Sequence, residues 1–164
     1  MTSSPTLPAA DFAPADTLGI RGRWLESDDP GVLVGETWVS PGGGAGPLHV
    51  HLRQAETFHV LDGAITVRLG RSRHVVRAGE TFHVPAGAPH TFVNHTDAEA
   101  HLTATFSPPG RIADVFAALE AAGGRPSLRE TARIMGELPE DFFYLAYVPV
   151  ALQRAIGALI RRLG

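Results

Sequence analysis

The most constraining feature of the chain is a set of three histidines and one glutamate at spacings suited to β-strands: His49, His51, Glu56 and His90. Residues two apart point to the same face of a strand, so the side chains of His49 and His51 project together while Val50 points away. This spacing predicts a strand that presents two imidazoles to one side. The histidine pair therefore favours a β-rich fold around the site.

The other two residues each open a further apolar run. Glu56 precedes residues 57–61, which predicts that the chain turns back into a neighbouring strand and brings the carboxylate beside the histidines. His90 opens the run 90–94 after the turn-rich segment 85–89. We expect all four side chains to meet in one site.

Three imidazoles and a carboxylate are ligands for a divalent transition metal: Fe, Mn, Ni, Zn or Cu. Four protein ligands leave one or two positions open on a five- or six-coordinate ion, and a catalytic metal needs such a position. The alternative is a group of buried, hydrogen-bonded side chains without a metal. The shared spacing of all four residues favours the metal site.

The ligands belong to two longer motifs. Residues 43–63 follow G-x5-H-x-H-x4-E-x6-G, and residues 79–94 follow G-x5-P-x-G-x2-H-x3-N. Both segments resemble the two motifs of the cupin superfamily, and the stretch 46–63 is most similar to small single-domain cupins of the quercetin-dioxygenase-like group. The resemblance implies a mainly β fold, a cupin-type jelly-roll β-barrel with His49, His51, Glu56 and His90 as metal ligands inside it.

The resemblance also implies chemistry: a mononuclear metal-dependent oxidoreductase, dioxygenase-like, that acts on a small organic substrate. Glu56 would serve as a ligand and as the base that accepts a substrate proton. The alternatives are a non-redox isomerase or lyase and a non-catalytic small-molecule-binding protein. Several relatives carry acidic residues where this chain has Arg53, Gln54 and Ala55, which leaves the substrate class open.

Composition excludes several other functions. All 14 basic residues are arginine, so lysine Schiff-base chemistry is excluded, and the absence of cysteine excludes disulfides and thiolate ligands. The net charge of −3 gives no general attraction to nucleic acid. A chain without cysteine fits a cytoplasmic location. The resemblance further suggests a homodimer, because exposed sheet edges favour pairing.

Three segments are predicted along the chain: a disordered leader over 1–16, the barrel over 17–108 and a C-terminal helical extension over 109–164. Within the extension, residues 112–122 predict a helix whose apolar stripe ends at a glycine pair. Ser127 and Glu130 form a capping-box pair that opens a second helix to about residue 135.

From about residue 139 the tail has apolar residues at steps of three and four, which predicts one amphipathic helix or two separated near Pro149. Its apolar length approaches the ~20 residues that span a bilayer. Arg154, Pro149 and the polar face argue against a span. Docking on the barrel or on a second subunit is favoured, and peripheral membrane contact is the alternative.

The remaining histidines are expected outside the ligand set: His59, His74, His83, His95 and His101. His59 lies three residues after Glu56, and residues an odd number apart on a strand point to opposite faces, so His59 should point away from the metal. The register of the last strand leaves open whether His101 faces the barrel. Asn94 and Gln54 are candidates to hydrogen-bond a ligand or a metal-bound water, although Asn94 also suits a turn.

Overall fold

The computed structural model describes residues 11–123, 127, 130 and 144–163. The described elements follow in chain order: β1 (Asp11–Thr17), β2 (Ile20–Leu25), β3 (Leu33–Val39), β4 (His49–Val50), β5 (Ala55–Asp62), β6 (Ala64–Leu69), β7 (Ser72–Arg77), β8 (Thr81–Val84), β9 (His90–Val93), β10 (Ala100–Ser107), α1 (Ile112–Ala121), β11 (Tyr144–Leu145) and α3 (Val150–Leu163).

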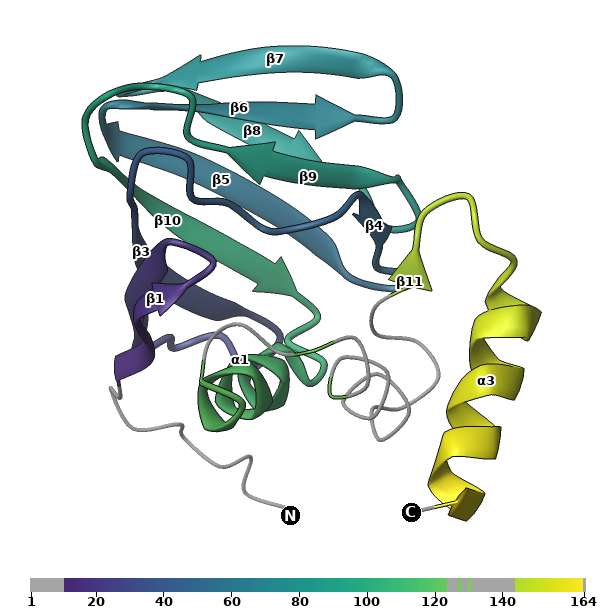
Figure 1. Cartoon of the computed structure of the whole chain (residues 1–164). Coiled ribbons are helices and arrows are strands. Elements are labelled where there is room, and N and C mark those ends of the chain that lie inside the picture. Colours follow the sequence, from purple (N-terminus) through teal and green to yellow (C-terminus); the bar gives the residue numbers. More distant parts are fainter. Residues whose placement is uncertain (1–10, 124–126, 128–129, 131–143, 164) are drawn as a thin grey trace.

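The strands form two antiparallel sheets that face each other (Figure 1). One sheet has the order β1-β2-β3-β10-β5-β8, and the other has the order β11-β4-β9-β6-β7. Neighbours in the sheets are often distant in the sequence, since β10 lies between β3 and β5. The prediction of a mainly β, jelly-roll fold is confirmed.

The core lies between the sheets because inward and outward residues alternate along each strand. In β10 the inward residues Ala100, Leu102, Ala104 and Phe106 are buried, and the residues between them are more exposed. β5 shows the same alternation, with Glu56 on the buried face together with apolar neighbours. The site therefore sits inside the hydrophobic core.

Part of the predicted leader forms a strand: residues 11–16 belong to β1. These residues lie in β1, which pairs with β2 in the register Asp11↔Arg23, Phe12↔Gly22 and Thr17↔Ile20. The strand contains Pro14, and β1 lies at the edge of its sheet, where a proline is tolerated on the unpaired side. Pairing with β2 satisfies the backbone groups that the segment would otherwise leave to water.

The first predicted helix is confirmed as α1, which follows the barrel and ends before Gly123, whose φ is +74°. α1 lies across one end of the two sheets (Figure 1). Trp24 of β2 contacts Phe116 of α1 edge-on, at 5.8 Å between ring centroids, and Phe106 of β10 edge-on, at 6.2 Å, so its ring links the helix to the sheet. α1 is therefore part of the same packed core as the sheets.

The C-terminal tail differs in part from the sequence prediction. Tyr144 and Leu145 form β11, which pairs with β4 beside the predicted ligands, and the helix α3 begins only at Val150. Pro149 precedes the helix, as expected of a residue that cannot continue an existing one. The predicted capping box is present: the backbone N–H of Ser127 donates to the Glu130 carboxylate, and the backbone N–H of Glu130 donates to the Ser127 hydroxyl. The rest of the second predicted helix lies outside the described residues.

α3 stands apart from the two sheets (Figure 1). Within the ranges that the structure describes, no helix combines the length and the apolar character needed to cross a membrane. The apolar stripe of α3 does not dock on the barrel, because its residues Leu152, Ile156 and Leu159 are exposed.

Candidate metal centre

The four predicted ligands meet in one buried cluster. His49 lies on β4 and His51 follows it, Glu56 lies on β5, and His90 opens β9 directly opposite His49 in the sheet register. Each residue offers one ligand atom, and these atoms lie within 4.8 Å of one another. All four residues are at most 5% exposed. Strand pairing therefore assembles the set that the motifs predicted.

Backbone carbonyls orient two of the imidazoles. The Nδ1 of His49 lies 2.9 Å from the carbonyl of Pro47, and the Nδ1 of His90 lies 2.9 Å from the carbonyl of Ala88. A carbonyl oxygen only accepts hydrogen bonds, so each Nδ1 is the donor. In a neutral ring this leaves the lone pair on Nε2, the atom available for a metal.

Glu56 holds the cluster together through one carboxylate oxygen. Its Oε1 lies 2.7 Å from the Nε2 of His51 and 3.5 Å from the Nε2 of His90. The Nε2 of His90 is buried and makes no hydrogen bond, which a polar atom seldom tolerates in a core. A cation bound between these atoms would supply the missing partner, so the donor set fits a metal ion.

Burial and mutual charge set the protonation of the cluster. Burial would raise the pKa of Glu56, but its contacts with His51 and His90 outweigh burial and hold the pKa well below its ordinary value. Burial, followed by repulsion from His51 and His90, lowers the pKa of His49 to about 3. Glu56 is therefore a carboxylate and His49 a neutral imidazole at neutral pH, which are the forms that bind metals.

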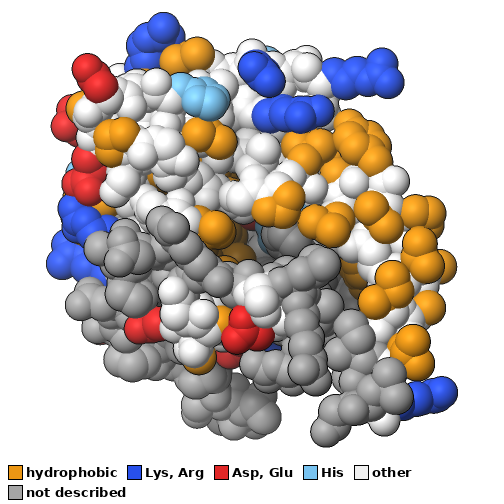
Figure 2. Space-filling view, in the orientation of Figure 1, with side chains coloured by type: hydrophobic (Ala, Val, Ile, Leu, Met, Phe, Trp, Pro, Cys, Tyr) orange, Lys and Arg blue, Asp and Glu red, His pale blue; other side chains and the backbone are white. Residues whose placement is uncertain are grey.

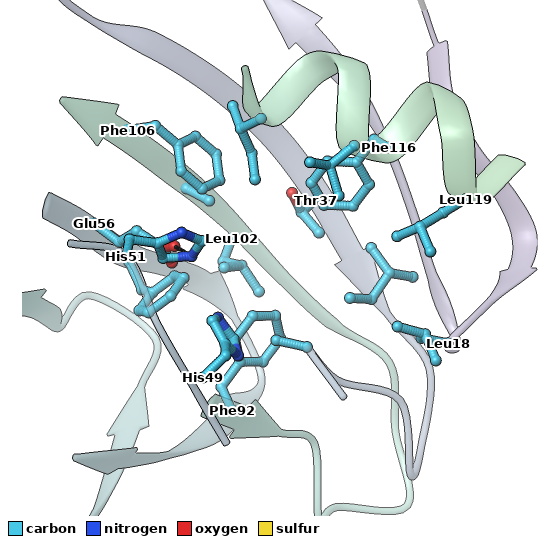
Figure 3. Close-up of a pocket in the computed structure, with 16 residues that line it drawn as sticks. Leu18, Thr37, His49, His51, Glu56, Phe92, Leu102, Phe106, Phe116 and Leu119 are labelled. Carbon is cyan, nitrogen blue, oxygen red and sulfur yellow. Dashed lines mark ion pairs between the residues drawn. The ribbon is translucent and has the colours of Figure 1, made fainter. Parts of the chain in front are cut away.

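The cluster opens onto a partly open cavity of about 90 Å³. Figure 3 shows His49, His51 and Glu56 at one end of this cavity and Phe116 and Leu119 of α1 at the other. Besides the three cluster residues, Thr37 is the one polar residue among the described lining residues. The apolar lining comes from both sheets and α1: Leu18, Ile20, Ala45, Phe58, Phe92, Leu102, Ala104, Phe106, Ile112, Val115, Phe116 and Leu119.

The two candidate polar helpers have structural roles. Asn94 is fully buried, and its amide donates to the carbonyls of Val39 and Ala98 while its oxygen accepts from Thr96, so the turn interpretation is the one confirmed. Gln54 donates from Nε2 to the carbonyls of Pro108 and Pro109, both at 2.8 Å. Gln54 therefore ties the ligand strand to the segment that leads into α1.

The other histidines with described contacts lie outside the cluster. His59 bonds Thr81 and His83 bonds Thr57 on the outer face of β5, as the parity of His59 predicted. His101 also faces outward: it stacks on Trp38 at 4.7 Å, and its Nε2 lies 2.9 Å from Glu36. The alternation along β10 resolves the register that the sequence left open.

Sequence analysis missed Thr37 and the contribution of α1 to the cavity. The apolar stripe of α1 was recognised, but nothing in the spacing showed that it lies over the barrel opening. The alternation of buried and half-buried residues along β3 places Thr37 on the inner face. A threonine at that parity was the available signal.

Comparison with known proteins agrees with this geometry. Residues 36–106 match the family model of the cupin domain (Cupin_2) and include all four cluster residues. The chain belongs to the cupin superfamily. A solved cupin-like structure, described as a predicted oxalate decarboxylase from Thermotoga maritima, superimposes with a TM-score of 0.54 and covers 65% of this chain and 99% of its own, at 16% identity. At that identity the likeness concerns the fold alone.

Two curated relatives share more sequence with this cupin. Oxalate oxidase GF-2.8 of Triticum aestivum is 31% identical over 139 residues, which cover 73% of this chain and 60% of the relative. Quercetin 2,3-dioxygenase of Bacillus subtilis (strain 168) is 40% identical over 50 residues, which cover 30% of this chain and 15% of the relative. The chain thus spans less than two thirds of the length of either relative.

Proposed function

We propose that this cupin is a mononuclear metal-dependent oxidoreductase that acts on a small organic substrate. One observation carries the proposal: a buried His–His–Glu–His cluster, in which the Nε2 of His90 makes no hydrogen bond, faces a largely apolar cavity. A buried polar set without full hydrogen bonding is costly for a structural role. It is the expected arrangement for a site that binds a cation and then a substrate.

Each residue of the cluster has a distinct role in holding the metal. His49 and His90 are held by backbone carbonyls, so their Nε2 atoms stay aimed at the cluster. His51 is held by Glu56. When bound to this set, a divalent transition metal (Fe, Mn, Ni, Zn or Cu) supplies a Lewis acid with an open position for a substrate oxygen. The apolar lining excludes water from that position.

Glu56 is the proposed catalytic residue. Among the cavity-lining residues that the structure describes, it alone carries a carboxylate, and it lies at the cluster end where a substrate would be bound. Glu56 is ionised and can therefore accept a proton, although a low pKa makes it a weak base. We therefore assign it first to holding the cluster and second to receiving a substrate proton.

The names of the relatives support redox chemistry over the alternatives. An oxalate oxidase and a quercetin 2,3-dioxygenase are both oxidoreductases, and the alignment with the first spans most of this chain. Non-redox isomerisation or lyase cleavage would use the same residues without consuming oxygen. The experiment must therefore separate metal binding from oxygen use.

The test has two stages. The metal content of purified protein is measured by elemental analysis, and oxygen uptake is then screened with small organic substrates after the native metal is restored. We expect about one metal ion per chain and substrate-dependent oxygen uptake. Glu56→Gln should keep part of the metal and lose turnover. Protein that carries no metal would overturn the site, whereas metal-dependent turnover without oxygen uptake would replace the redox assignment by the non-redox one.

A further inference from the structure

The cavity has a polar end and an apolar end. His49, His51 and Glu56 form the polar end, and the opposite end is lined by Val115, Phe116 and Leu119 of α1. Figure 3 shows Phe116 and Leu119 on the side away from the ligand cluster. A molecule bound at the cluster would therefore direct its far end into hydrocarbon.

The described lining carries no arginine, although arginine is abundant elsewhere in the chain. A substrate with a second negative charge would have to leave that charge at the apolar end, among hydrocarbon side chains and without a partner among the described lining residues. Burying an unpaired charge costs several kcal/mol. The cavity lining therefore disfavours dicarboxylates, including the substrate named for the wheat relative.

The volume of the cavity further limits which substrates can bind. A cavity of about 90 Å³ is smaller than the ~150 Å³ that accepts benzene in a protein core. We propose that the site takes a small substrate with one oxygen-bearing head group and an apolar tail of a few carbons, and that it rejects dicarboxylates of the same length. This inference rests on the proposed metal site and adds the substrate class.

Butanoate and succinate test the class, because they differ only in whether the far end is a methyl group or a carboxylate. Protein loaded with Co(II) reports ligand binding by its visible absorption, and azide serves as a probe of an open position on the metal. We expect butanoate to bind at least about tenfold more tightly than succinate, a difference of about 1.4 kcal/mol. No Co(II) spectrum would contradict the metal site itself. A spectrum that responds to azide with succinate bound as tightly as butanoate would overturn only the substrate class.

A variant pair sharpens this test. Leu119→Arg places a cation at the apolar end and should move the preference towards succinate. Ala117→Arg puts the same side chain at an exposed position of α1 and should leave the preference unchanged. An equal change in both variants would show that overall charge, not the cavity lining, decides the selectivity.

α3 supports a second, independent inference. Leu152, Ile156 and Leu159 repeat at helical spacing and are 51%, 46% and 57% exposed. Gln153, in contrast, points towards β11: its side-chain amide accepts a hydrogen bond from the backbone N–H of Leu145 at 2.9 Å and donates one to the carbonyl of Leu145 at 3.0 Å. The helix is thus anchored by its polar side, and its apolar stripe faces solvent, where Figure 2 shows hydrophobic side chains gathered.

The charge of α3 indicates what covers the stripe. The helix contains Arg154, Arg161 and Arg162 and no acidic residue, within a chain whose net charge is −3. A basic amphipathic helix suits the surface of an anionic bilayer, whereas two copies packed stripe to stripe would bring like charges together. We propose that α3 binds peripherally to anionic lipid surfaces, with Leu152, Ile156 and Leu159 inserted between headgroups.

Co-sedimentation of the full chain with phosphatidylcholine–phosphatidylglycerol vesicles tests this proposal. We expect binding that weakens with salt and is much weaker on phosphatidylcholine alone. Ile156→Glu should abolish binding, while Ala151→Glu, the same charge change away from the stripe, should retain most of it. The absence of vesicle binding by the intact chain would overturn the proposal. Self-association lost in Ile156→Glu, measured by light scattering, would assign the stripe to a second copy instead.

Discussion

His49 and His90 lie directly opposite each other across the β4–β9 pair, with their ring centroids 4.5 Å apart, although each belongs to a different sequence motif. Both rings donate from Nδ1 to a carbonyl two residues earlier in the chain. The same local device therefore aims two Nε2 atoms from separate strands at one point. The proposed metal site therefore depends on strand register as well as on residue type.

Removal of one ligand should empty the site. His51→Ala deletes the Nε2 atom that lies 2.7 Å from Glu56, and we expect a loss of metal affinity beyond the roughly 10–100-fold typical of residues that only support ligands. Elemental analysis of the purified variant provides the measurement. His83→Ala is the matched control, since His83 bonds Thr57 on the outer face and should keep full metal content. Equal metal loss in both variants would contradict the site.

Metal removal should lower thermal stability, because the ion binds the folded cluster and satisfies the buried Nε2 of His90. At metal concentrations of about 100 times Kd the stabilisation is about 2.7 kcal/mol. Calorimetry with and without a chelator measures the shift in Tm. The Tm of the His51→Ala variant should not change when a chelator is added. An unchanged wild-type Tm in the presence of the chelator would show that the cluster holds no ion.

Gly44 should not tolerate a side chain. A Cβ at this position would collide with the backbone carbonyl of Phe92, so Gly44→Ala should lower the free energy of unfolding by about 1–3 kcal/mol. A glycine at this position therefore allows the close approach of the two backbones. Gly70→Asn is the control: its φ of +58° suits asparagine and nothing lies within 4 Å. Urea unfolding that ranks Gly70→Asn as the worse variant would contradict this account.

The loss of protein stability at acid pH should depend on Glu36. Burial raises the pKa of Glu36, but hydrogen bonds from Arg23 and His101 outweigh burial and lower the pKa below 4.5. A lowered folded-state pKa gives stability that is present above pH 4.5 and is lost as pH falls through the folded value. Glu36→Gln should therefore lower Tm at pH 7, and the difference from wild type should shrink below pH 4.5. A difference that grows towards acid pH would reverse the sign and refute the assignment.

Much of the centre was predictable because its signals are local. The i, i+2 spacing of His49 and His51 fixes a shared strand face, and the parity of His59 excludes it from that face, whatever the rest of the chain does. Short-range patterns also predicted the helix α1 and the Ser127–Glu130 cap. Homodimer formation and cytoplasmic location stay predictions.

The sequence by itself determined the donor set, the β-rich class and the family motifs, because residue type and spacing of two to seven residues carry that information. Only the tertiary structure decided which strand faces which, and hence that His101 points outward while Thr37 points in. It also decided that residues 11–16 pair as an edge strand, that α1 lines the cavity and that the stripe of α3 stays exposed. Those features arise from contacts between distant segments, whose register no local pattern encodes.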